Sequence, residues 1–120
     1  MLSLNGSFRY YLHRDYTDLR KGFDSLSGIV RNEMGSNPLS GDIFIFFNRR
    51  RNQVKLLQWD KDGFAIYYKR LEKGTYELPE IKNKNLQMEL TNESLMLILQ
   101  GICLRSIKRR IRYEMCKNTG

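Results

Sequence analysis

Histidine, cysteine and proline are scarce in this chain of 120 residues, which holds one His, two Cys and two Pro. The two cysteines, Cys103 and Cys116, form no CxxC pair, so the sequence does not favour a structural zinc site. The only histidine, His13, has no cysteine or serine partner at a spacing that would indicate a nucleophile and its base. We therefore expect no cofactor, no metal and no catalytic role.

Long apolar runs are also missing. The longest, Ile43–Phe47 and Leu95–Leu99, have five residues each, whereas a membrane-spanning helix needs about 20. The first residues lack the charged and apolar regions of a secretion signal, and two cysteines without such a signal are typical of reduced thiols. These absences predict a cytoplasmic protein that does not enter a membrane.

Acidic residues are fewer than basic ones, 13 against 21, which leaves a net charge of +8. The excess predicts attraction to polyanions, either nucleic acid or an anionic membrane surface. A basic tail at 106–120 has helical spacing but lacks the wide bulky apolar face of membrane-surface helices, so nucleic acid is favoured. With 41% apolar residues, we expect one α+β domain at 1–105 followed by this tail.

The apolar spacing predicts a small antiparallel sheet of about three to five strands with two principal helices. Alternation indicates strands at 8–13, 42–48, 53–59 and 64–71, and a short one near 86–90. A helix is expected from Asp18 to Met34, capped by Thr17 or Asp18 and ended by Gly35. The second helix is expected at 92–100, with Thr91 at its start.

Four-residue loops would place Trp59 opposite Phe64 and Leu57 opposite Ile66, and both faces of this hairpin sheet are then apolar. One face would carry Phe44, Phe46, Leu57, Trp59, Phe64 and Ile66, and the other Ile43, Ile45, Phe47, Val54, Leu56, Ala65 and Tyr67. We expect Trp59 to be a core residue. We expect the first helix to cover one face. The other face could be covered by the short second helix, by the N-terminal strand or by a partner protein, and we expect it to be partly exposed.

The segment from Pro38 to Gly74 also resembles a known family, the small TnpB accessory proteins of bacterial insertion sequences of the sixty-six family, also called second-open-reading-frame proteins. The resemblance covers roughly residues 15 to 105. It rests on the stretch from Asp18 to Asp24 with Leu26, on Asn48-Arg49-Arg50, and on Trp59-Asp60 followed by Gly63-Phe64. It implies an accessory role in DNA transposition, in which a separate and larger transposase carries out strand transfer.

Clustered basic residues are the candidate DNA contacts, because guanidinium and ammonium groups bind phosphates without reading the base sequence. An exposed, solvated loop is the alternative interpretation of the arginine cluster. The candidates are Arg49, Arg50, Arg51, Lys55, Lys69 and Arg70, with Lys108, Arg109, Arg110 and Arg112 in the tail. The expected partners are DNA, which the resemblance implies to be the element ends, the transposase of the same element, and a second copy of the chain.

Two alternatives to DNA binding remain open. The chain can be an adaptor that docks on the transposase through the apolar sheet face, without touching DNA. It can also be a metal-dependent nuclease, if Asp60, Asp62 and Glu72 converge near Lys69. Ordinary turn chemistry explains the first two carboxylates equally well, so the non-catalytic interpretation is preferred.

Overall fold

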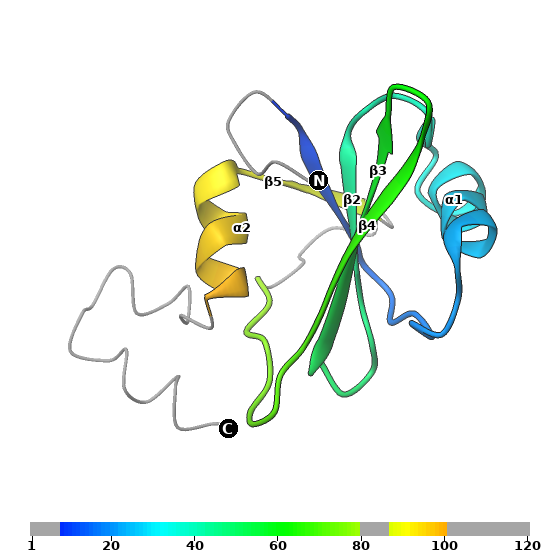
Figure 1. The fold of residues 1–120 in the computed structure, drawn as a ribbon. Coiled ribbons are helices and arrows are strands. Elements are labelled where there is room, and N and C mark those ends of the chain that lie inside the picture. Colours follow the sequence, from blue (N-terminus) through cyan, green and yellow to red (C-terminus); the bar gives the residue numbers. More distant parts are fainter. Residues whose placement is uncertain (1–7, 80–86, 101–120) are drawn as a thin grey trace.

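The computed structural model describes residues 8–79 and 87–100, which form one sheet with a helix on either side (Figure 1). This arrangement confirms the predicted α+β class. Neither helix in these ranges is long and apolar enough to cross a bilayer. In chain order the elements are β1 (Tyr10–His13), α1 (Phe23–Asn32), β2 (Ile43–Phe47), β3 (Gln53–Asp60), β4 (Gly63–Arg70), β5 (Gln87–Leu90) and α2 (Asn92–Leu99).

The sheet has the strand order β4-β3-β2-β1-β5. The two hairpins of β2, β3 and β4 have the predicted register, with Trp59 opposite Phe64 and Leu57 opposite Ile66. The exception to an antiparallel sheet is β1, which lies parallel to β2, with Tyr10 beside Ile43. Parallel pairing is possible here because α1 lies in the long connection between the two strands and returns the chain to the same end.

Helix α1 begins at Phe23 rather than at Asp18, so the predicted caps are wrong. Its N-cap is Gly22, which has extended backbone angles and offers no side chain. Asp18 instead accepts hydrogen bonds from the backbone N–H and the guanidinium of Arg20, and the backbone N–H of Thr17 donates to β2. The segment before α1 is therefore a loop held against the sheet.

The other helix boundaries agree better with the sequence. Gly35, just beyond the end of α1, has a φ of +66°, a conformation that glycine adopts without a Cβ clash. The side chain of Thr91 accepts a hydrogen bond from the backbone N–H of Ser94 and caps α2, as predicted. Both helices thus end or begin at residues whose chemistry favours that boundary.

The two faces of the sheet form two separate apolar cores, with the predicted division of residues. On one face, α1 packs its buried stripe against β2 and β3. That core contains Leu19, Leu26, Ile29, Val30, Met34, Phe44, Phe46 and Leu57. The other contains Tyr10, Leu12, Ile43, Ile45, Phe47, Val54, Leu56, Tyr76, Leu90, Leu95, Ile98 and Leu99.

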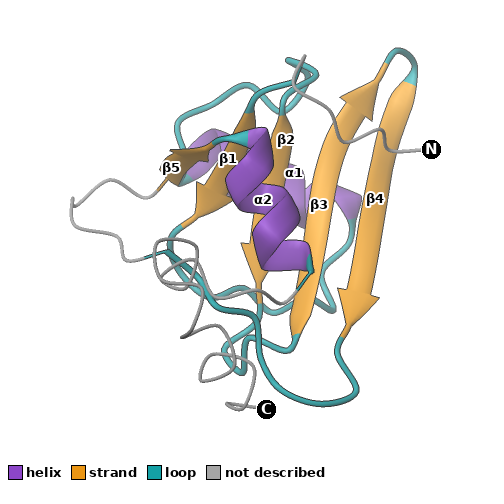
Figure 2. Cartoon of the chain, turned by 90° about the vertical axis from the view of Figure 1, so that its left-hand side faces the viewer, coloured by secondary structure: helices purple, strands orange, loops and turns teal. Residues whose placement is uncertain are grey.

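The prediction of an exposed apolar patch on the second face is wrong. Segment 71–79, which follows β4, places Leu71, Tyr76 and Leu78 against this core together with α2. Its course is fixed by Tyr76, whose backbone N–H donates to the carbonyl of Arg51 at 2.7 Å. Figure 2 looks onto this face and shows α2 in front of the sheet, with the chain after β4 crossing back toward β5.

Trp59 is half-buried, which corrects the expectation that it is a core residue. It lies one residue before the end of β3, and its ring meets the edge of Phe64 at 5.1 Å between centroids. The buried stripe of α1 packs on Leu57, while the first residue of the helix, Phe23, stacks on Phe64. The indole therefore lies at the margin of the core.

Stability measurements should separate the core from its margin. Phe46→Ala removes a fully buried ring between the sheet and α1 and should lower the free energy of unfolding by about 3–5 kcal/mol. Trp59→Ala should cost less, about 1–2 kcal/mol, because the indole lies at the margin of the core and is only partly buried. Urea denaturation would measure both losses, provided that the dependence of the unfolding free energy on urea keeps the same slope. Equal losses for the two variants would contradict the placement of Trp59 at the margin of the core.

Tyr76 makes a second test. Its hydroxyl is buried and has no hydrogen-bond partner within the described part of the chain, and burial raises the pKa of Tyr76 to about 12. Tyr76→Phe should therefore fold with equal or greater stability at neutral pH. Since the folded-state pKa is raised, the parent should lose stability relative to this variant as pH rises from 10 to 12. Thermal melts of the parent and the variant across that pH range would measure this difference. An equal loss of stability in both proteins would contradict the prediction.

Candidate nucleic-acid interface

The turn between β2 and β3 is held in shape by Asn48. Its Oδ1 accepts hydrogen bonds from the backbone N–H groups of Asn52 at 3.1 Å and Gln53 at 2.9 Å. Its carbonyl oxygen accepts another from the N–H of Arg51 at 3.0 Å. An Asn side chain that satisfies the backbone of its own turn restricts the turn to one conformation. The three adjacent arginines are therefore presented from a fixed support.

Tyr16 brings two of these arginines together. The guanidinium carbons of Arg49 and Arg51 lie 5.7 and 5.9 Å from the centre of its ring, within the range of cation–π attraction. Arg51 also donates a hydrogen bond to the Tyr16 hydroxyl at 3.1 Å. Arg51 has a φ of +59°, a left-handed conformation that is uncommon for residues other than glycine. These contacts hold it there.

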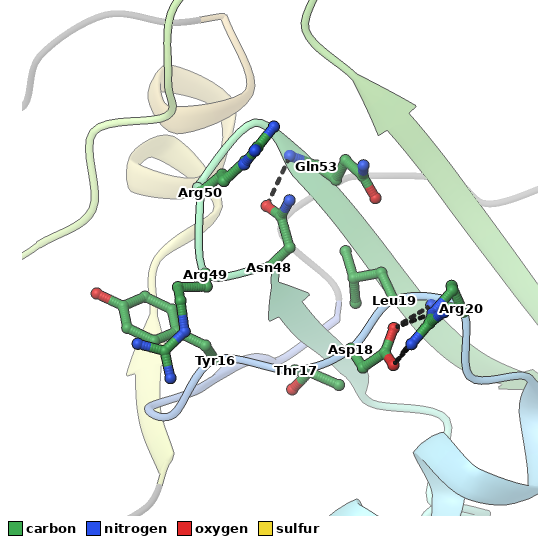
Figure 3. A pocket seen from close by; sticks show the side chains of 9 residues that line it. All are labelled: Tyr16, Thr17, Asp18, Leu19, Arg20, Asn48, Arg49, Arg50 and Gln53. Carbon is green, nitrogen blue, oxygen red and sulfur yellow. Dashed lines mark hydrogen bonds and ion pairs between the residues drawn. The ribbon is translucent and has the colours of Figure 1, made fainter.

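A pocket of about 480 Å³ opens between this turn and the loop before α1 (Figure 3). Its lining carries three guanidinium groups and one carboxylate, which gives a net charge of +2 (three minus one). The residues are Tyr16, Thr17, Asp18, Leu19, Arg20, Asn48, Arg49, Arg50 and Gln53.

The single carboxylate of the pocket is already paired. Asp18 accepts hydrogen bonds from Arg20, the shortest at 2.8 Å, and these hold the pKa of Asp18 at about 2. Among the residues that the structure describes, no acidic side chain forms an ion pair with Arg49 or Arg50. Their positive charge is therefore available to an external anion.

The remaining predicted DNA contacts are distributed over two faces. Lys55 lies on the α1 side, where its Nζ donates to the carbonyl of Lys21 at 3.1 Å. Arg70 lies on the same side, opposite Gln53. Lys69 points to the opposite face of the sheet, the α2 side, and is therefore separated from Lys55 and Arg70. The tail candidates Lys108, Arg109, Arg110 and Arg112 lie outside the described residues.

Sequence reasoning missed Tyr16 and Arg20 as members of this site. Tyr16 meets Arg51 from 35 positions away in the chain, and no local pattern indicates such a contact. The sequence indicates Arg20 only as a charged residue on a helix face. The folding of the loop before α1 against the arginine turn is what joins them.

The carboxylates proposed for a nuclease do not converge. Asp60 pairs with Gly63 at one end of the β3–β4 hairpin, and Asp62 lies in the turn there. Glu72 follows Arg70 at the opposite end, where its carboxylate lies 4.0 Å from that guanidinium. The length of β4, about 23 Å, separates them. The nuclease hypothesis on these residues is therefore wrong.

His13 occupies a different place. Its ring is buried and hydrogen-bonded through Nδ1 to Thr17 at 3.2 Å and through Nε2 to Glu33 at 3.1 Å. Asp15 lies nearby: one of its carboxylate oxygens is within 4.8 Å of a ring nitrogen of His13 and of a carboxylate oxygen of Glu33, atoms that could act as metal ligands. Because both ring nitrogens already have protein partners, His13 serves to fasten the end of β1 to the end of α1.

Comparison with known proteins extends these observations. The family described as IS66 Orf2 like protein matches residues 8–109. Two uncharacterized proteins of Sinorhizobium fredii (strain NBRC 101917 / NGR234) are similar over most of both chains. One, y4jC, is 27% identical over 92% of each chain, and the other, y4hO, is 29% identical over 85% of this chain and 87% of its own. No solved structure matches.

The match includes both the arginine turn and the loop that faces it. The family is tied to the IS66 insertion sequences and suggests an accessory role in their transposition. This agrees with the resemblance carried by Asn48-Arg49-Arg50 and by the Trp59-Asp60 and Gly63-Phe64 pairs. The chain belongs to the IS66 Orf2-like family.

Proposed function

We propose that this protein is a non-catalytic accessory protein of DNA transposition that binds DNA through the arginine turn of residues 49–51. One observation carries the proposal. Asn48 fixes the turn, and the guanidinium groups of Arg49 and Arg50 line an open pocket without an acidic partner among the described residues. Arg20, by contrast, has the carboxylate of Asp18 close by.

The chemistry of the turn fits phosphate better than a base edge. Guanidinium forks bind phosphate oxygens in a bidentate manner, and such contacts position a protein on DNA without reading its sequence. Arg20, on the opposite wall of the pocket, is neutralised by Asp18. The net positive charge therefore lies on the side of the turn, where Lys55 and Arg70 continue it along the α1 side of the sheet.

The accessory role assigns strand transfer to another protein. The resemblance implies a separate, larger transposase of the same element, and DNA at the element ends is the ligand that both proteins would share. The adaptor alternative relied on an exposed apolar sheet face, and that face is covered by α2 and segment 71–79. Direct DNA binding is therefore the better-supported function.

The test compares two double variants of equal charge. Arg49→Ala/Arg50→Ala should weaken the binding of duplex DNA similarly for element-end and scrambled sequences. The slope of log K against log salt should become shallower by roughly 0.9 for each phosphate that the variant no longer binds. Arg51 is left in place because its contacts support the turn. Fluorescence anisotropy at several salt concentrations gives both quantities.

The matched control is Arg31→Ala/Lys61→Asn, which removes two exposed positive charges away from the pocket. Asn is used at position 61 because this residue has a φ of +59°, which Asn tolerates. The control should bind DNA nearly as well as the parent. Equal losses in both variants would mean that net charge alone attracts DNA, and undiminished binding by the first variant would remove the turn from the interface.

A further inference from the structure

Aromatic rings make up most of the large hydrophobic surface that the described part of the chain exposes. Within residues 8–79 and 87–100, four large hydrophobic side chains are exposed, and three of them are aromatic: Tyr16, Phe23 and Tyr68, at 45, 47 and 49%. Single exposed apolar residues need no explanation. Two of these rings, Phe23 and Tyr68, lie beside a row of half-buried rings on the α1 side, a pattern that packing does not require.

The register of β3 and β4 arranges this row. Residues of the two strands that face α1 pair along the hairpin in the order Gln53–Arg70, Lys55–Tyr68, Leu57–Ile66 and Trp59–Phe64. Leu57 is buried under α1, whereas Tyr68 and Arg70 are exposed. From Gln53 to Trp59 the row spans about 20 Å. β4 is the edge strand, so no further strand flanks the row on that side within the described part of the chain.

Contacts among these residues hold the rings in place. Phe23 stacks on Phe64 with 6.3 Å between centroids and 15° between planes, and Trp59 meets Phe64 edge-on. Lys55 lies 5.6 Å above the ring of Tyr68, while its Nζ is bound to the carbonyl of Lys21. These contacts with neighbouring side chains hold the rings in fixed orientations.

The row is continuous with the pocket at the arginine turn. Gln53 belongs to both, since it lines the pocket and stands at the end of the row. Positive charge from Arg49, Arg50, Lys55 and Arg70 is gathered at this end. Asp24, Asp60 and Asp62 lie near the other end, around Trp59 and Phe23. The surface therefore has a basic half, which includes Tyr68, and a second half with Trp59, Phe64 and Phe23, which also carries the carboxylates.

We infer that this surface, named here the aromatic strip and made of Phe23, Lys55, Trp59, Phe64, Tyr68 and Arg70, binds single-stranded DNA. Bases stack on Phe23, Tyr68 and the indole, and the phosphates pass the basic half toward the arginine turn. Single-strand binders combine these two features, stacking rings and a cationic path for the backbone. The inference rests on the proposed function and adds the form of DNA that is recognised.

The charge pattern favours nucleic acid over a protein partner. The core of a protein interface is depleted in charged residues, Lys included, whereas Lys55 places its ammonium group over the ring of Tyr68. Duplex DNA keeps its bases stacked on each other, so it can reach the arginine turn but cannot use the rings. Single-stranded DNA can use both.

Trp59 is the only tryptophan in the chain and reports on the strip directly. A single-stranded oligothymidylate should quench its fluorescence in a saturable manner, because a base stacks against the indole. A duplex of the same length, and an oligonucleotide of abasic sites with the same charge, should bind without this quenching. Equal quenching by the abasic chain would show a charge effect only and would overturn the inference.

Variants then locate the contact. Phe23→Ala and Tyr68→Ala each remove an exposed ring, and each should weaken single-strand binding roughly tenfold, because one base can no longer stack. The matched control is Leu39→Ala, an equally exposed apolar residue in the loop before β2, which should bind like the parent. Thermal melts confirm that all three variants remain folded.

The outcomes distinguish this inference from the proposed function. If Arg49→Ala/Arg50→Ala loses duplex binding while the ring variants bind single strands like the parent, the strip is wrong and the proposed function stands. If the ring variants lose single-strand binding while the arginine variant binds duplex normally, the strip stands and the arginine turn is wrong. If this surface binds an acidic peptide and no DNA, both the aromatic strip and the proposed function are wrong.

Discussion

The rest of this structure depends on the middle of the five-stranded sheet, which is apolar on both faces. Strands β2 and β3 cannot leave either face in water, because burial of their Phe, Ile, Leu and Val side chains is the main favourable term in folding. The chain therefore has to supply two covers. It places α1 on one face and α2 with segment 71–79 on the other.

This requirement also builds the candidate interface. To bring α1 over the sheet, the chain must leave β1, pass the end of β2 and turn back, and it does so in the loop before α1. That loop is anchored where Thr17 donates to the carbonyl of Phe47. The arginine turn lies just beyond, so Tyr16 arrives beside Arg49 and Arg20 on the opposite wall of the pocket as a consequence of covering the core. The loop that covers the core therefore also brings basic charge and the exposed ring of Tyr16 to the arginine turn.

The same geometry explains the aromatic strip. Helix α1 has ten residues, and its buried stripe covers Phe44, Phe46 and Leu57 but only part of the edge strand β4. Rings at the end of the β3–β4 hairpin are then left half-covered, with Phe23 as their last contact. A longer helix, starting at Asp18, would have altered this margin. Gly22 and the Asp18–Arg20 pair set the start of the helix instead.

The sequence by itself determined the local features: the two hairpins, their register through Trp59 and Phe64, the division of apolar residues between two faces, and the caps at Gly35 and Thr91. These follow from residue alternation and turn chemistry over short spans. Only the tertiary structure decided that β1 runs parallel to β2, that Tyr76 closes the second face, that Trp59 lies at a margin, and that Tyr16 meets Arg51. Each of these depends on contacts between residues far apart in the chain, whose pairing is chosen by the packing of the whole core and leaves no periodic signal in the sequence.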